Sequence, residues 1–349
     1  MGYNVFDEMR TYQYGSVHMV YDEPTGLRGI VAIHDDRLGP SLGGCRFVMY
    51  DTEAEAIVDA LRLARGMTSK AALAGIPHGG GKSVIIKPEG DVDRTELFLA
   101  FGRFIDTLGG RYITAEDSGT TIDDMETMLT VTKHVTGVTV EHGGSGDPSP
   151  FTALGVRRGI EAAASLVLQR SSLEGLVVAV QGVGAVGYNL CRELHSLGAE
   201  LLVADIDETK TGKARDEFGA EVVSLDGIYS VACDVFAPCA LGGAVNDVSI
   251  EQLSAKIVAG AANNQLSEPR HGQMLLERGI TYVPDYAINS GGLINVAQEV
   301  IGYDRDAATK RVLEIYETIV QILEQASAAE TPPTLVADRL TEAALSRAG

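Results

Sequence analysis

The chain has 349 residues, more than a single hydrophobic core usually serves, so two domains are expected. Hydrophobic residues make up 45% and charged residues 22%, as is typical of globular proteins. A formal net charge of −20 argues against binding to nucleic acid or to an anionic membrane surface. No apolar run reaches the roughly eighteen residues of a membrane span.

The cysteines carry no metal or disulfide signature. There are four of them, at Cys45, Cys191, Cys233 and Cys239. None forms a CxxC pair, and no histidine lies at ligand spacing from them. We therefore expect free thiols in a cytoplasmic protein and no metal site.

The first part of the chain mixes strand and helix patterns. Strands are predicted at residues 16–22, 26–35, 82–87 and 111–117. Apolar positions at helical spacing predict helices over 53–75 and 94–110. The segment 141–150, "EHGGSGDPSP", is rich in Gly, Pro and Ser and predicts a linker.

After the linker, helices and strands alternate regularly. A helix over 151–169 leads to the apolar run "GLVVAVQG", which is typical of a strand buried on both faces. Further strands are predicted at 200–207, 234–240, 256–263 and 281–287. Helices are predicted at 185–198, before the first of these strands, and at 210–219, between the first and the second. This alternation predicts a parallel sheet with helices on both faces. Two amphipathic helices, 306–330 and 333–348, end the chain.

A dinucleotide-binding motif opens the helix that follows the apolar strand. Its residues are Gly182, Val183, Gly184, Ala185, Val186 and Gly187. The first glycine permits a tight turn, the second lets the backbone approach a pyrophosphate, and the third allows close helix–strand packing. Asp205 ends the next strand, at the spacing where a carboxylate binds a ribose diol and repels a 2′-phosphate. NAD is therefore favoured over NADP, and a packing turn without a ligand is the weaker interpretation.

The segment "IPHGGGKSVI", residues 76–85, superficially resembles a phosphate-binding P-loop. That motif needs a glycine at position 76, where this chain has Ile76. A P-loop also opens a helix, whereas a β-branched run follows these glycines. Lys82 therefore has another role.

The first domain carries ionisable residues suited to proton transfer, namely Lys70, Lys82 and Asp117. Two lysines that converge in a glycine-lined cleft would repel each other, and this repulsion together with desolvation would lower the pKa of one of them. A decrease of about three units, or ~4 kcal/mol, would make that lysine a base near neutral pH. The alternative for any one lysine is a solvated surface charge.

Seven blocks of sequence, in order, resemble the glutamate/leucine/phenylalanine/valine dehydrogenase family. They are "LGGCRF", "MTSKAALAGIPHGGGKSVI", "GRYITAEDSGTT", "GDPSPFTALGV", "VQGVGAVG", "GAANNQL" and "NSGGLINVAQE". The resemblance implies a two-domain α/β fold. A substrate-binding, catalytic and oligomerisation domain would span 1–147, and a doubly wound Rossmann NAD domain 148–330. The last helix, 331–349, would pack back on the first domain, and the chain would form homo-oligomers.

The resemblance also implies roles for individual residues. Lys82 would activate water, Asp117 would shuttle protons to and from the amine, and Lys70 would hold the substrate α-carboxylate. Gly43 and Gly44 would shape that end of the cleft, and the glycines before Lys82 would make room for substrate. Two further residues, Thr152 and Asn263, would contact the nicotinamide end of the cofactor.

The side-chain pocket implied by the resemblance is apolar. It consists of Leu42, Ala115, Leu293 and Val296. Glutamate dehydrogenases of the family carry a lysine where this chain has Leu42, so glutamate should be rejected. Ser118 and Ser290 depart from the residues more common at those positions.

The implied reaction is NAD-dependent oxidative deamination of leucine, isoleucine or valine. A phenylalanine or tryptophan dehydrogenase is the alternative, because an apolar pocket discriminates weakly among apolar side chains. A non-catalytic NAD-binding redox sensor is a distant alternative, opposed by the presence of all three ionisable residues.

Overall fold

The computed structural model describes residues 4–348, and contacts divide the chain into two compact units. Unit 1 holds the described residues up to Gly146, the segment Val296–Arg305 and the chain from Thr341 onward. Unit 2 holds Asp147–Asn295 and Asp306–Leu340. Residues 296–305, which fall inside the second predicted domain, thus count with unit 1, and the last helix contributes to both units.

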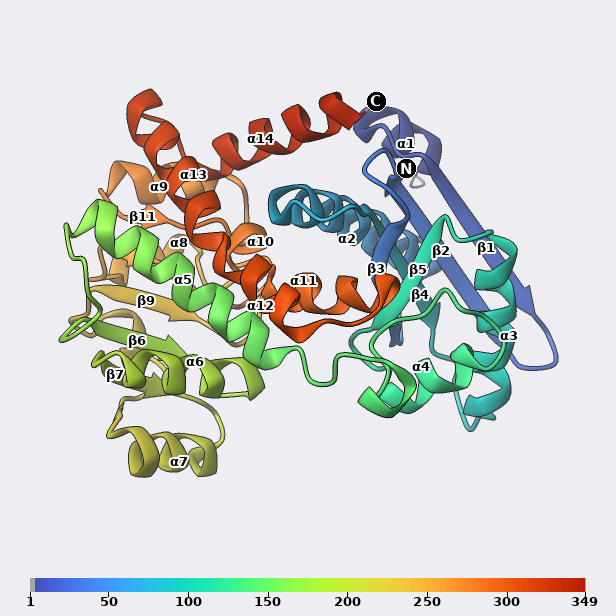
Figure 1. The fold of residues 1–349 in the computed structure, drawn as a ribbon, viewed down its shortest axis with the longest axis horizontal. Coiled ribbons are helices and arrows are strands. Elements are labelled where there is room, and N and C mark those ends of the chain that lie inside the picture. The colour runs from blue at the N-terminus through green and yellow to red at the C-terminus, as the bar shows by residue number, and fades with distance from the viewer. Residues whose placement is uncertain (1–3, 349) are drawn as a thin grey trace. The chain divides into compact units, whose positions relative to one another are not determined.

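Unit 1 is built on a five-stranded mixed sheet in the order β1-β2-β4-β3-β5 (Figure 1). The strands are β1 (Ser16–Asp22), β2 (Leu27–Asp35), β3 (Ser41–Val48), β4 (Gly79–Ile86) and β5 (Tyr112–Glu116). The strand β2 pairs antiparallel with both β1 and β4, whereas β3 pairs parallel with both β4 and β5. The helices and 3-10 turns of this unit are α1 (Val5–Tyr12), α2 (Glu53–Ala74), α3 (Arg94–Thr107), α4 (Ile122–Leu129), η1 (Val140–His142) and η3 (Gln298–Ile301).

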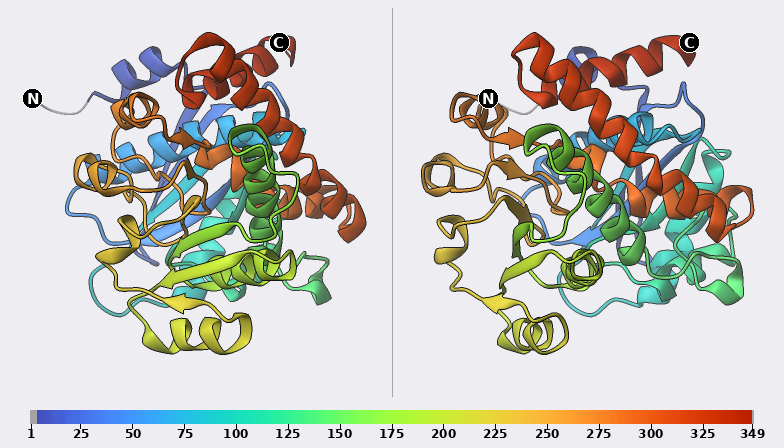
Figure 2. Two further views of the ribbon diagram at one scale, coloured as in Figure 1. Left: turned by 90° about the vertical axis from the view of Figure 1, so that its left-hand side faces the viewer. Right: turned by 60° about the vertical axis from the view of Figure 1, so that its left-hand side comes forward.

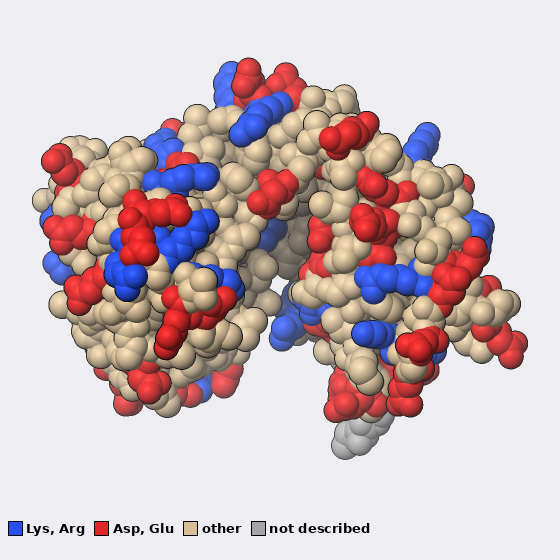
Figure 3. Space-filling view, turned by 90° about the horizontal axis from the view of Figure 1, so that it is seen from below, with Lys and Arg blue, Asp and Glu red and all other residues tan. Residues whose placement is uncertain are grey.

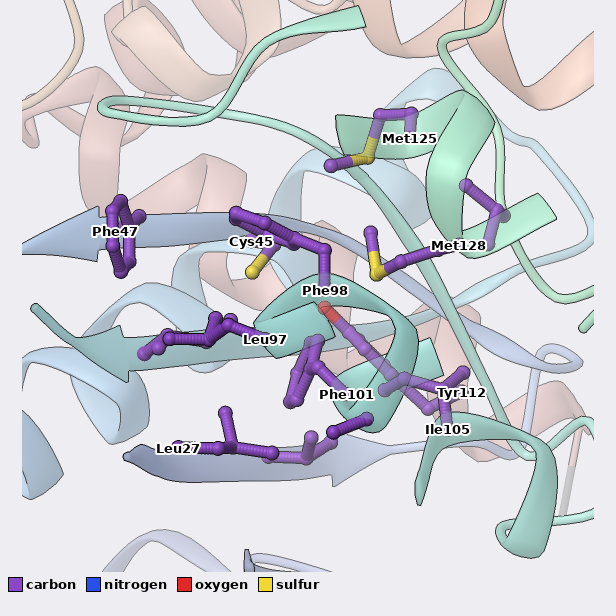
Figure 4. Packing of buried hydrophobic residues seen from close by; sticks show 14 of the residues in the cluster. Leu27, Cys45, Phe47, Leu97, Phe98, Phe101, Ile105, Tyr112, Met125 and Met128 are labelled. Carbon is purple, nitrogen blue, oxygen red and sulfur yellow. The ribbon is translucent and has the colours of Figure 1, made fainter. Parts of the chain in front are cut away.

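Two apolar layers cover the faces of this sheet because strand side chains alternate between them. Val31 and Ile85 join the cluster under α3 and α4, whereas their neighbours Ile30 and Val84 join the cluster under α2. Figure 4 shows the first cluster, in which side chains of β2 and β3 lie against α3 and two methionines come from α4. The helix α2 therefore defines one face of the sheet and α3 the other.

The glycine-rich segments of unit 1 are strands, although they give little strand signal. The strand β4 begins at Gly79 rather than at the predicted position 82, and β3 was not among the predicted strands. Glycine is depleted in strands generally. Here it is accommodated because neighbouring backbone lies too close for a side chain: a Cβ on Gly80 would lie 2.1 Å from the backbone nitrogen of Thr68 in α2.

Replacing Gly80 by alanine should therefore destabilise the fold. The clash involves backbone of α2, so we expect a loss of about 3 kcal/mol or more in the free energy of unfolding. The matched control is Gly66→Ala in the same helix, where an added Cβ meets nothing within 4 Å. Alanine is a better helix former by about 1 kcal/mol, so the control should be neutral or stabilising. Denaturant unfolding checks both; equal stability of the two variants would contradict the packing account.

Unit 2 is a doubly wound α/β domain with a six-stranded parallel sheet in the order β11-β10-β9-β6-β7-β8. Figure 2 shows its strands and helices, coloured from green to orange. The strands are β6 (Val177–Gln181), β7 (Glu200–Ala204), β8 (Glu221–Val222), β9 (Val235–Pro238), β10 (Ile257–Val258) and β11 (Thr281–Tyr282). The order reverses between β6 and β9, which is the switch point where ligands bind in such sheets. The predicted parallel α/β class is confirmed.

The helices of unit 2 follow the predicted alternation, with one break. They are α5 (Ser149–Val167), α6 (Ala185–Ser196), α7 (Glu208–Phe218), η2 (Gly227–Tyr229), α8 (Asp247–Gln252), α9 (Arg270–Glu277), α10 (Asp285–Ile288), α12 (Arg305–Leu313) and α13 (Ile315–Ala329). Two further helices, α11 (Gly291–Ala297) and α14 (Pro333–Ala348), belong partly to each unit, and Arg305, the first residue of α12, counts with unit 1. The single helix predicted over 306–330 is interrupted at Glu314. In unit 2, α5 and α13 pack side by side (Figure 1).

The surface and the cysteines match the composition. Figure 3 shows acidic side chains on both units, interspersed with basic ones, as the net charge of −20 requires. All four cysteines are free thiols, as predicted. Among residues 4–348, none of the helices combines the length and the apolar character that a membrane span needs.

Candidate active site

Strand alternation brings Leu42, Gly44, Lys82 and Ala115 to the face covered by α2. On β4, Lys82 lies two residues before Val84, which packs under α2. On β3, the pairs Leu42–Gly80 and Cys45–Ser83 place Gly44 beside Lys82. On β5, Ala115 pairs with Gly44, and Asp117 follows two residues later.

Lys82 and Asp117 form an ion pair at this face. The Lys82 side chain is 6% exposed and that of Asp117 is 20% exposed. The other carboxylate oxygen of Asp117 accepts a hydrogen bond from the Ser118 N–H at 2.5 Å. An amine and a carboxylate in contact, largely shielded from water, can exchange a proton with each other and with a bound reactant.

Burial lowers the pKa of Lys82 from its ordinary value of 10.5 to about 7. The next largest cause is the guanidinium of Arg46, and Lys70 contributes less. The predicted direction is thus correct, but desolvation and an arginine dominate, rather than repulsion between two lysines. A substantial fraction of neutral amine near pH 7 follows, as a general base needs.

The glycines of β3 and β4 in this region lie against protein atoms rather than against open space. A Cβ on Gly79 would lie 2.0 Å from the Asp35 carbonyl oxygen, and one on Gly81 would lie 2.7 Å from the Tyr112 ring. Gly43 and Gly44 are equally confined. A Cβ on Gly43 would lie 1.8 Å from the Gly81 carbonyl oxygen, and one on Gly44 would lie 2.7 Å from the Asp117 Cβ. The glycines instead bring β3, β4 and α2 together, which is how Lys82 and Asp117 come into contact.

The loop that carries Asp117 is fixed by Thr120, which the sequence patterns did not single out. The Thr120 hydroxyl accepts a hydrogen bond from the Asp117 N–H at 2.9 Å and lies 2.9 Å from the Cys45 carbonyl oxygen. Phe47 donates its N–H to the Ser118 carbonyl at 2.9 Å. The loop is thus attached to β3 at two points just after Asp117.

The other residues predicted to bind substrate, and Ser290, lie at the following positions. Lys70 is half-buried in the last two turns of α2, two residues after Thr68, the residue that Gly80 contacts. Leu42 is buried at 1% exposure, and Ala115 is half-buried. Leu293 and Val296 are both half-buried on α11, Leu293 counting with unit 2 and Val296 with unit 1. Ser290 is buried and donates its hydroxyl to the Ala287 carbonyl.

In unit 2, the three motif glycines have the three environments that a dinucleotide loop requires. Gly182 has φ +94°, the left-handed region that glycine alone adopts readily. A Cβ on Gly184 would meet nothing within 4 Å, so backbone is approachable there, at the N-terminus of α6. A Cβ on Gly187 would lie 2.0 Å from the Gly182 carbonyl oxygen, so the helix packs directly on the turn.

Asp205 is positioned against this loop. One carboxylate oxygen accepts a hydrogen bond from the Val183 N–H at 2.7 Å, and the other accepts from the Asp207 N–H at 2.9 Å. Thr152 donates its hydroxyl to the Pro148 carbonyl at 3.2 Å in the first turn of α5. Asn263 is exposed, and its carbonyl oxygen accepts from the Asn289 amide at 2.9 Å.

One group of potential metal ligands exists among the described residues, outside the predicted site. It comprises Asp247, Glu268 and His271. Arg270 pairs with both carboxylates, at 2.6 and 2.8 Å. His271 Nδ1 accepts the Glu268 N–H at 3.0 Å, so the proton of the neutral ring resides on Nε2. The two carboxylates and His271 Nδ1 are therefore engaged by the protein, and we assign no metal to this group.

The chain matches known proteins along nearly its whole length. Residues 13–134 match the Glu/Leu/Phe/Val dehydrogenase dimerisation domain, and residues 201–332 match the glutamate/leucine/phenylalanine/valine dehydrogenase domain. A leucine dehydrogenase of Geobacillus stearothermophilus is 53% identical over 97% of this chain and 92% of its own length. An L-tryptophan dehydrogenase of Nostoc punctiforme is 48% identical over 97% and 95%.

The fold agrees with these matches. The crystal structure of L-tryptophan dehydrogenase from Nostoc punctiforme superimposes with a TM-score of 0.88, at 45% identity and 99% coverage of both chains. The resemblance on seven sequence blocks is confirmed, and the chain belongs to the glutamate/leucine/phenylalanine/valine dehydrogenase family.

Proposed function

We propose that this protein catalyses the reversible NAD-dependent oxidative deamination of apolar L-amino acids, with leucine, isoleucine and valine preferred. L-Amino acid, NAD⁺ and water give the 2-oxo acid, ammonium, NADH and a proton. The observation that carries the proposal is the buried Lys82 amine in contact with Asp117. A redox sensor without chemistry would have no use for that pair.

The residues of unit 1 supply proton transfer and binding. Lys70 holds the substrate α-carboxylate by charge. Asp117 takes a proton from the substrate ammonium, so that the amine can lose hydride from its Cα. Neutral Lys82 then deprotonates water as it attacks the resulting iminium carbon, and its ammonium form stabilises charge that develops on oxygen. Asp117 returns a proton to the departing amine.

The glycine loop of unit 2 would hold the cofactor, which accepts the hydride when bound. NAD rather than NADP is favoured by the acidic end of β7, where Asp205 is followed by Asp207 and Glu208. The first basic residue after them, Lys210, is itself 3.8 Å from the Asp207 carboxylate. A 2′-phosphate would meet carboxylates there. Thr152 and Asn263 are proposed to contact the nicotinamide end.

The apolar character of Leu42, Ala115, Leu293 and Val296 favours an apolar substrate side chain. A glutamate side chain would place an unpaired carboxylate against Leu42, which costs several kcal/mol, about 10²-fold or more in kcat/KM. Relatives named leucine dehydrogenase, at 53% identity, support the branched-chain preference, and the one named L-tryptophan dehydrogenase, at 48%, keeps an aromatic substrate as the alternative. We also propose that the protein is cytoplasmic and forms homo-oligomers.

Initial rates of NADH formation with six L-amino acids test the substrate assignment. The panel is leucine, isoleucine, valine, phenylalanine, tryptophan and glutamate, each with NAD and with NADP. We expect the highest kcat/KM for the branched-chain set with NAD, and glutamate about 10²-fold or more below leucine. Preference for an aromatic substrate would overturn the pocket assignment while leaving the reaction intact. Higher activity with NADP would overturn the role of Asp205.

A further inference from the structure

Arg46 lies beside the Lys82–Asp117 pair and was not among the predicted site residues. It is on β3, two residues after Gly44 and on the same face of the sheet. Its guanidinium contacts the Asp59 carboxylate of α2 at 2.7 Å and lies 4.0 Å from the Asp117 carboxylate. The Arg46 side chain is 25% exposed, and that of Asp59 is 18% exposed. The cation is therefore held in a partly desolvated site, where charge interactions are strong.

Arg46 is itself held in place by a second layer of contacts. Tyr50 donates its hydroxyl to the same Asp59 oxygen that contacts Arg46, at 2.7 Å. The Arg46 Nε is buried and has no hydrogen-bond partner among the described residues. Its orientation consequently depends on Asp59, which accepts from both Arg46 and Tyr50.

A fixed guanidinium has a definite effect on its neighbours because it does not lose its proton in the accessible pH range. The charged and titratable groups that act on Lys82 are Arg46 and Asp117 on its own face of the sheet, Asp59 and Lys70 from α2, and Cys45 from the opposite face of β3. Among the cations, Arg46 has the larger effect on the pKa of Lys82. It disfavours a second positive charge on Lys82.

We propose that Arg46 is a positioning residue that disfavours protonation of the Lys82 amine and orients the Asp117 carboxylate, with Asp59 and Tyr50 holding Arg46 in place. The catalytic role that this inference gives to Arg46 rests on the proposed function. The electrostatic part of the inference concerns the amine alone and can be tested without any substrate.

The test measures the protonation of Lys82 directly. A brief pulse of acetic anhydride acetylates neutral amines, and peptide mass spectrometry compares labelling of Lys82 with a free-amine standard from pH 5.5 to 10. In Arg46→Gln, which keeps a donor for Asp59 but removes the charge, the midpoint should rise by about one pH unit. In Arg46→Lys, which restores the cation, it should return toward the wild-type value.

Three further measurements make the test decisive. Arg111→Met, which removes an exposed arginine paired with Asp36 on the same unit, should leave the midpoint unchanged. The double variant Arg46→Gln/Asp59→Asn avoids an unpaired carboxylate if Arg46→Gln fails to fold. Its midpoint should also rise, but by less than in Arg46→Gln, because Asp59 itself raises the pKa of Lys82. The kcat/KM for leucine in Arg46→Gln should fall about tenfold at pH 6 but within about twofold of wild type at pH 9.5.

An unchanged midpoint in a folded Arg46→Gln or double variant would overturn the inference. An equal shift in Arg111→Met would also overturn it, because the effect would then be one of net charge. If no amino acid is turned over by the wild type, the proposed function fails, while the labelling midpoints still decide the role of Arg46.

Discussion

Replacing Lys82 by methionine is expected to lower kcat for deamination about 10³-fold or more, because a positioned general base contributes about 10²–10⁴ in rate. Methionine retains an apolar stem in a site that is 5% exposed, so the fold should be kept. NADH binding, followed by its fluorescence, should be unchanged, since the glycine loop belongs to unit 2. Retention of more than about a tenth of wild-type kcat would exclude Lys82 as the base.

The same residue predicts two pH dependences. In wild type, kcat/KM should rise through about pH 7 as Lys82 loses its proton, because the neutral amine is the active form. Stability should also depend on pH. The pKa of Lys82 is about 7 in the folded chain and ordinarily 10.5, so the unfolded chain binds more protons between these values. The free energy of unfolding of wild type should therefore increase from pH 7 to 10.5 relative to Lys82→Met. A constant difference across that range would contradict the buried, neutral amine.

Replacing Asp117 by asparagine should have the second largest effect. Asparagine can still accept the Ser118 N–H, so the loop should remain in place, but it cannot transfer a proton. We expect kcat to fall about 10²–10⁴-fold, with a much smaller change in KM. Asp36→Asn, which removes an exposed carboxylate paired with Arg111, is the matched control and should retain wild-type kcat.

Asp117→Asn also distinguishes a catalytic carboxylate from a merely structural one. Removing the anion beside Lys82 disfavours the protonated amine, so the acetylation midpoint of Lys82 should move to lower pH. This shift is opposite to that expected for Arg46→Gln. A fall in kcat accompanied by loss of stability and no change in midpoint would indicate that Asp117 only holds the loop.

The parts of the fold that follow apolar periodicity could be predicted from sequence. The strand β1 has the predicted bounds, and α2 and α6 differ from theirs by one or two residues. The glycine-rich strand segments could not be found this way. They are glycine-rich because another element packs closely against them, as α2 does at Gly80 and Thr68, and no local sequence pattern records such a contact. The break at Glu314 likewise interrupts a continuous helical pattern.

The candidate site divides along similar lines. Lys82, Asp117 and the glycine loop carry motifs, and family resemblance pointed to them. Arg46 and Asp59 carry none, since they act through a contact between β3 and α2 that depends on sheet register. One signal was available: alternation along "LGGCRF" places Leu42, Gly44 and Arg46 on one face. The depressed pKa of Lys82 was foreseen in direction, but its principal causes required burial and geometry.

The most direct test of the account is the stoichiometry of products from ¹⁵N-labelled leucine and NAD. Oxidative deamination predicts NADH, 4-methyl-2-oxopentanoate and ¹⁵N-ammonium in equal amounts. Lys82→Met should form all three at a rate lower by about 10³-fold or more. NADH formed without labelled ammonium, or no product from any amino acid in protein that binds NADH, would contradict the assignment of Lys82 and Asp117 to amine chemistry.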